Sequence, residues 1–151
     1  MALSQDLREF VESFLSNEVK FVVVGAYAMA YHRLPRLTGD IDLFVSPNEE
    51  NLVRVCKALD DFGFGSLGVH PTDLLGENQV LQLGRPPNRI DVLTGISGVT
   101  FQEAWADKVM GELEGLTVPF ISRELLMRNK EASGREKDLL DLKLLRQQSP
   151  G

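Results

Sequence analysis

Several features are scarce in this 151-residue chain, and each scarcity excludes a class of protein. The single cysteine, Cys56, rules out an intramolecular disulfide framework and any metal site built from the cysteines of one chain. No apolar run approaches the roughly 20 residues that a membrane span needs, so no membrane partner is expected. The phosphate-binding pattern Gly-x-x-x-x-Gly-Lys-Ser/Thr is also absent, which excludes a P-loop enzyme.

An excess of positive charge is missing as well. The chain has 16 basic and 22 acidic residues, a formal net charge of −6, which argues against nonspecific binding of nucleic acid by the chain as a whole. The first residues lack the charged-then-apolar order of a signal peptide. Together with the lone cysteine, this predicts a protein of the reducing cytoplasm.

Apolar patterning predicts one domain over residues 1–151, because 43% of the residues are hydrophobic and no linker or repeat interrupts them. Strands and helices alternate along the sequence. Helices are predicted over 4–16, 26–34, 47–63, about 122–131 and about 134–146. Strands are predicted over 20–25 and 40–46 and within 74–85 and 88–96, and 112–122 is predicted as a hairpin or strand. We therefore expect an α/β (α+β) fold, a small mixed β-sheet with helices packed on it.

Two aspartates at the start of the predicted strand 40–46 are the main sign of chemistry. In a strand, residues i and i+2 point to one face, so Asp40 and Asp42 project together about 7 Å apart. At that distance two carboxylates repel by roughly 2 kcal/mol at an effective dielectric near 20, and the following Leu-Phe-Val offers no cation. With Asp91 on another predicted strand, three carboxylates could hold one or two Mg²⁺ ions. In the structural alternative, Asp42 pairs with Arg36 or Arg89 and Asp91 caps a strand.

Gly25 ends an apolar strand just before a predicted helix, where a missing side chain lets backbone N–H groups approach a phosphate. The alternative is a plain tight turn. With the spacing that follows, this stretch resembles the DNA polymerase beta-like nucleotidyltransferase superfamily. The signature elements are Gly25-Ala26, a gap of thirteen residues, Asp40-Ile41-Asp42, and later Asp91, over a core of about 19–95.

The fuller patterns "VGAYAMAYH", "RLTGDIDL" and "ISRELLMRNKEASGREKDLLDLKLL" resemble minimal stand-alone bacterial nucleotidyltransferases related to the abortive-infection toxin enzymes. That resemblance implies a nucleotidyltransferase-like core followed by two C-terminal helices, about 122–146, that contribute a lysine and an aspartate to the active site. The matching residues are Lys130 and Asp138, with Asp141 as a further candidate.

The resemblance implies a Mg²⁺-dependent transfer of a nucleoside monophosphate from an NTP such as ATP to a hydroxyl acceptor, with release of pyrophosphate. The acceptor is an RNA 3′ end, a protein or a small molecule. Asp40 and Asp42 would hold Mg²⁺ on the triphosphate, Asp91 would bind the second ion and help deprotonate the acceptor, and Lys130 would neutralise phosphate charge.

Further residues of the resemblance concern the nucleotide. Gly25, Ala26, Arg36, Thr38 and Asp138 would contribute to nucleotide binding, and Arg36 and Thr38 could contact phosphate or acceptor. Ala26 stands where the family usually carries glycine or serine, so a hydroxyl contact to the triphosphate is lost. The alternative is therefore a non-catalytic nucleotide-binding or toxin–antitoxin-type regulatory module of the same fold. A homodimer could complete the cleft of so short a chain.

Overall fold

The strand β1, Phe21–Val24, lies inside the sheet, and all four of its side chains are buried. The computed structural model describes residues 5–34, 40–63, 68–76, 78–84 and 89–148. β1 pairs antiparallel with β2, Ile41–Val45, and parallel with β6, Leu116–Phe120. A strand that is apolar on both faces needs covering layers on both sides.

Six strands of the described chain form one mixed sheet in the order β3-β4-β2-β1-β6-β5. β4 runs parallel to β2, whereas β3 and β5 pair antiparallel with β4 and β6 and form the two edges. The bounds of these three strands are β3 Val80–Leu83, β4 Ile90–Leu93 and β5 Val109–Leu113. The predicted α/β class with a mixed sheet is confirmed, and the segment 112–122 belongs to the β5–β6 hairpin.

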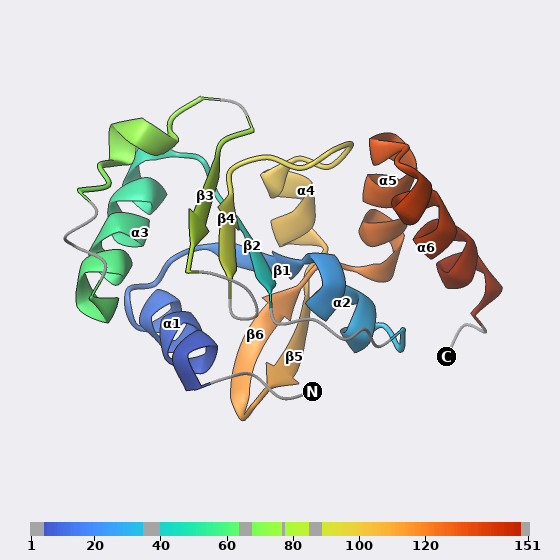
Figure 1. Ribbon diagram of the computed structural model, residues 1–151, viewed down its shortest axis with the longest axis horizontal. Helices are drawn as coiled ribbons and strands as arrows, with labels where there is room; N and C mark the ends of the chain where they lie inside the picture. Colours follow the sequence, from blue (N-terminus) through green and yellow to red (C-terminus); the bar gives the residue numbers. More distant parts are fainter. Residues whose placement is uncertain (1–4, 35–39, 64–67, 77, 85–88, 149–151) are drawn as a thin grey trace.

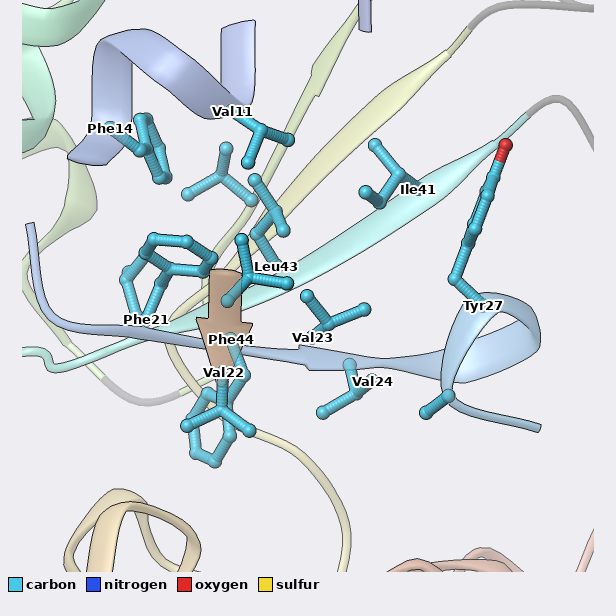
Figure 2. Close-up of a cluster of buried hydrophobic side chains, with 14 of the residues drawn as sticks. Val11, Phe14, Phe21, Val22, Val23, Val24, Tyr27, Ile41, Leu43 and Phe44 are labelled. Atoms are coloured by element: carbon cyan, nitrogen blue, oxygen red, sulfur yellow. The ribbon is translucent and has the colours of Figure 1, made fainter. Parts of the chain in front are cut away.

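Helices cover the sheet on both faces. Figure 2 shows Phe21 and Leu43 on the same side of the strands as Val11 and Phe14, which belong to α1, Gln5–Ser16. The opposite face carries Phe44, whose ring meets Phe101 edge-on at 5.3 Å between centroids. Phe101 begins α4, Phe101–Ala106. Burying aromatic side chains on both faces supplies much of the apolar area that stabilises the domain.

All five predicted helices are present, with shifted ends. α2 spans Gly25–Tyr31, so it begins one residue before and ends three residues before the predicted 26–34. It ends early because Arg33 adopts a left-handed φ of 74°. α3 spans Glu49–Phe62 between the N-cap Asn48 and the left-handed C-cap Gly63, close to the prediction. The prediction missed α4 and a 3₁₀ turn, η2, Pro71–Leu74.

The predicted C-terminal helices are α5, Arg123–Ser133, and α6, Glu136–Gln147. They pack on each other at one end of the molecule, whereas α3 stands at the opposite end (Figure 1). Gln148, just after α6, donates a side-chain hydrogen bond to the carbonyl oxygen of His32 at 2.7 Å, which fastens the pair to the end of α2. Within the described residues, no helix combines the length and the apolar character that a membrane crossing requires.

Candidate active site

Asp42 and Asp91 lie side by side on neighbouring parallel strands. β2 and β4 pair so that Asp42 is opposite Asp91, and paired residues of a sheet project from the same face. This is the face that also carries Phe44, two residues after Asp42 on β2. The two carboxyl groups lie within hydrogen-bonding reach of each other, and Asp91 is only 8% exposed. The predicted convergence of these two acids is therefore present in the structure.

The environment of Asp42 disfavours its charge. Burial and, after it, the neighbouring Asp91 carboxylate raise the pKa of Asp42 from 3.8 to about 7. Asp40 adds to the same effect, and only Arg89 opposes it. A carboxyl group in this state is stabilised by a proton or by a cation placed between it and its neighbour. Asp42 is thus an incompletely compensated carboxylate near neutral pH.

Gly25 makes room for the Asp42 carboxyl group. Gly25 has a left-handed φ of 70°, and a Cβ placed on it would lie 2.1 Å from Asp42 Oδ2 and 3.0 Å from Asp42 Cγ. Real Cβ atoms do not come that close to another heavy atom. The sequence explained Gly25 by the approach of a phosphate, whereas the structure adds a specific role, namely that only glycine fits beside the Asp42 carboxylate.

Asp40 lies just before β2 and contacts Arg89, which lies just before β4. Arg89 Nη2 is 3.4 Å from Asp40 Oδ2, and the Arg89 backbone N–H donates to Asp40 Oδ1 at 3.3 Å. The same guanidinium binds Asp91 through two hydrogen bonds, Nε to Oδ1 at 3.0 Å and Nη2 to Oδ2 at 3.2 Å. Arg89, which the structural alternative paired with Asp42, thus bridges Asp40 and Asp91 instead.

A divalent metal fits the chemistry of this site but not its present arrangement. Within the described ranges, no group of three or more His, Cys, Asp or Glu side chains is arranged to hold a metal ion as it stands. Arg89 contacts carboxylate oxygens of both Asp91 and Asp40. The three carboxylates outnumber the one guanidinium that contacts them within the described part of the chain, and carboxylate oxygens are the ligands that Mg²⁺ prefers.

Tyr27 is a neighbour of the site that the sequence did not point out. It belongs to α2, is 2% exposed and lies beside Ile41 of β2 (Figure 2). Burial, with a smaller contribution from the Asp40 charge, raises the pKa of the Tyr27 hydroxyl, which therefore stays protonated. Ala26 sits partly buried at the second position of α2, whereas Arg36 and Thr38 lie outside the described residues.

Lys130 belongs to a second polar cluster, between α5 and α6. Its Nζ donates to Asp138 Oδ1 at 3.1 Å and to Asp141 Oδ2 at 3.0 Å, and all three side chains are at most 10% exposed. Asp138 also accepts hydrogen bonds from Ser133 Oγ and, at 2.9 Å, from Arg135 Nε. Lys130 and Asp138, which the resemblance assigned to the active site, thus pair with each other in an ion network between α5 and α6.

The Asp138 carboxylate is strongly favoured in its charged form. Burial, the largest single influence, raises its pKa, but hydrogen bonds from Ser133 and Lys130 and the Lys130 charge outweigh burial, so the pKa lies below its ordinary value. A buried charge network of this kind is satisfied internally. Its visible contribution is to the packing of the C-terminal helices, and a part in nucleotide chemistry remains a prediction.

Comparison with known proteins finds similarity at the level of structure. Comparisons of the sequence with protein families and with curated proteins gave no match. The lincosamide antibiotic adenylyltransferase LnuA, in its lincomycin-bound form, is 14% identical with a TM-score of 0.55 over 97% of this chain and 99% of that chain. A candidate nucleotidyltransferase from Thermotoga maritima is 16% identical with a TM-score of 0.58, over 94% of this chain and 91% of that chain.

A third solved structure agrees with these two. ANT(2″)-Ia, in complex with adenylyl-2″-tobramycin, is 13% identical with a TM-score of 0.55, over 92% of this chain and 84% of that chain. Sequence identities this low support a shared fold and nothing finer. The relation to abortive-infection toxin enzymes remains a prediction. This chain thus has the overall fold of these three solved structures, two of which are named as an adenylyltransferase and a nucleotidyltransferase.

Proposed function

We propose that this protein is a metal-dependent nucleotidyltransferase that moves a nucleoside monophosphate from an NTP to a hydroxyl acceptor and releases pyrophosphate. The observation that carries the proposal is the meeting of Asp40, Asp42 and Asp91 at the starts of β2 and β4, next to Gly25. Buried carboxylates in excess of their counter-charge are costly to folding, and binding of a cationic ligand offsets that cost.

In the proposed reaction, an acceptor hydroxyl oxygen attacks the α-phosphorus of the NTP, and the bond from that phosphorus to the oxygen bridging to the β-phosphate breaks. Pyrophosphate leaves with the bonding electrons, and Asp91 accepts the hydroxyl proton. Asp40 and Asp42 would hold one Mg²⁺ ion with the triphosphate, and Asp91 would ligate a second ion. Mg²⁺, when bound, supplies Lewis-acid neutralisation of the triphosphate charge.

The donor and the acceptor are inferred from the names of two similar structures. Two of the similar structures are named for adenylyl transfer to antibiotics, an adenylyltransferase of lincosamides and a complex with adenylyl-tobramycin. We therefore favour ATP as the donor and a small-molecule hydroxyl as the acceptor. An RNA 3′ end and a protein hydroxyl are the other acceptors to be compared in the same assay.

Calorimetric titration of ATP with Mg²⁺ tests the site. The wild-type protein is expected to bind the pair, and Asp42→Ala is expected to lose most of that affinity because a carboxylate ligand is gone. Asp60→Ala is the matched control, since Asp60 is an exposed aspartate on α3. Equal binding by wild type and Asp42→Ala, or no binding by either, would contradict the assignment of the site.

Incubation with α-³²P-labelled ATP tests turnover. Wild-type protein with Mg²⁺ is given an aminoglycoside, a lincosamide, cellular RNA or cellular protein, and label transferred to the acceptor is measured. We expect label on a small molecule and none in the Asp42→Ala reaction. Retained ATP binding without any labelled product would favour the non-catalytic regulatory module instead.

A further inference from the structure

Arg89 holds two of the three site carboxylates at once. Its guanidinium donates two hydrogen bonds to Asp91 and lies 3.4 Å from Asp40, while its backbone N–H also donates to Asp40. A two-point contact of this kind is the strongest way for arginine to bind a carboxylate. Arg89 therefore occupies the oxygen atoms that would otherwise be available to an incoming cation.

The Arg89 guanidinium is nevertheless partly exposed to solvent. The Arg89 side chain is 31% exposed, whereas the Asp91 side chain is 11% exposed. Arg89 can thus leave the carboxylates toward solvent, but Asp91 stays fixed at its register position on β4. Of the two anions in the bridge, Asp91 is the buried one, whereas the Asp40 side chain is 33% exposed and as open to solvent as the guanidinium. A solvent-exposed guanidinium against a buried carboxylate on a strand is an arrangement suited to exchange.

We propose that Arg89 is a built-in counter-cation that competes with the metal for Asp91 and Asp40, so that metal loads effectively only together with a nucleotide. This inference rests on the proposed function. A metal ion arriving alone must displace a favourable guanidinium–carboxylate contact and leave Arg89 without an anion. A metal arriving with a triphosphate brings new oxygen atoms that the guanidinium can bind in the same bidentate manner.

Charge balance gives the direction of the effect. Removing Arg89 takes one positive charge away from the three carboxylates, so the site attracts a divalent ion more strongly. Replacing one guanidinium contact in a partly exposed site is expected to tighten binding of metal alone by about tenfold. The same change removes a triphosphate contact, so the mutual enhancement of metal and nucleotide binding should shrink.

Calorimetry on the full chain tests this with Mn²⁺ as the probe, with and without a nonhydrolysable ATP analogue. The proteins are wild type, Arg89→Ala, Arg89→Gln and Arg54→Ala. Arg54 is the matched control, because it is also a partly exposed arginine in a carboxylate pair, with Glu50 on the surface of α3. Circular dichroism checks that each variant is folded, and Arg89→Gln keeps a hydrogen-bonding side chain if Arg89→Ala does not fold.

The expected result is that Arg89→Ala, or Arg89→Gln, binds Mn²⁺ alone about tenfold more tightly than wild type, while the analogue improves Mn²⁺ binding less. Arg54→Ala should match wild type. If folded Arg89 variants bind Mn²⁺ equally or more weakly, Arg89 only ties the two strands together and the inference is wrong. If wild type binds neither Mn²⁺ nor the analogue, the proposed function fails and the inference falls with it.

Discussion

Gly25 offers the sharpest test of how the candidate site is built. Substitution by alanine adds a single methyl group, and that Cβ would lie 2.1 Å from Asp42 Oδ2, whereas ordinary van der Waals contact begins at 3.4 Å. The Asp42 carboxyl group must turn away, or α2 must shift. Gly25→Ala thus displaces the Asp42 carboxylate without removing it. The variant therefore tests the position of the carboxylate and not its charge.

Two separate effects lower the free energy of unfolding of Gly25→Ala. A left-handed φ at a residue with a Cβ costs about 1 kcal/mol, and forcing an atom into an occupied space costs a further 1–2 kcal/mol or so. Gly134→Ala isolates the first contribution, because Gly134 has a φ of 66° and no atom within 4 Å of an added Cβ. We expect Gly134→Ala to lose about 1 kcal/mol of unfolding free energy and Gly25→Ala about 2–3 kcal/mol.

The two glycine variants should differ more in Mg²⁺ and ATP affinity than in stability. Misplacing a group that positions a metal ligand typically lowers metal affinity by about 10- to 100-fold. Gly25→Ala is therefore expected to bind Mg²⁺ and ATP at least about tenfold more weakly. Gly134→Ala should bind them as wild type does. Urea denaturation measures the stability of each variant, and calorimetric titration of ATP in saturating Mg²⁺ measures its affinity.

Equal losses of stability in the two variants, together with unchanged ATP affinity in Gly25→Ala, would refute the reasoning. That outcome would mean that the Asp42 carboxyl group moves freely and that its position beside Gly25 has no functional importance. If Gly25→Ala loses stability but not ATP affinity, the packing of Gly25 against Asp42 is supported, but its importance for the proposed binding site is contradicted.

Three further predictions concern charged residues. Lys130→Ala is expected to lower the free energy of unfolding by about 3 kcal/mol in urea, because the buried carboxylates of Asp138 and Asp141 both lose its charge and hydrogen bonds, whereas Lys137→Ala on the exposed side of α6 should change it by less than about 0.5 kcal/mol. Because the folded-state pKa of Asp138 lies below its ordinary 3.8, its contribution to stability is present above about pH 4 and is lost as the pH falls through the folded value. The unfolding free energy of Asp138→Asn should therefore fall less steeply with acid, which thermal melts between pH 2 and 6 or so would show. In EDTA at about pH 8, Asp42→Asn should be more stable than wild type by about 1–3 kcal/mol, because a poorly compensated buried charge is gone. The difference should shrink as the pH falls through about 7, where the folded wild-type carboxyl group takes up a proton, and vanish below its ordinary pKa of 3.8, where the group is neutral in the unfolded state as well.

Local patterns predicted much of the fold. The apolar run of β1 and the helix between Asn48 and Gly63 are present because burial and capping agree there with sequence preference. α4 was missed although Thr100 and Glu103 form a capping box, a signal visible in the sequence. A six-residue helix is too short to show apolar periodicity, so packing of Phe101 on Phe44 is what defines it.

The candidate site was predictable in part. Spacing predicted that Asp40 and Asp42 project together, and the position of Asp91 in a second apolar strand added it to the site before the family resemblance did. The position of Arg89 could not be derived, because its contact with Asp40 depends on how β2 and β4 are paired, which sequence distance does not reveal. The same holds for Gly25, whose neighbour is a carboxylate from the next strand.

The parallel pairing of β2 with β4 also has an evolutionary consequence. Asp42 faces Asp91 because backbone hydrogen bonds align Ile41 with Ile90, and the chain between these strands takes no part in that alignment. Length changes between Val45 and Val80 that fall outside α3 and its buried face should therefore be tolerated without disturbing the carboxylates. A one-residue deletion inside either strand would turn an acid to the opposite face. This connecting segment is accordingly where relatives can diverge in length, and acquire new binding partners, while the arrangement of the acids is inherited unchanged.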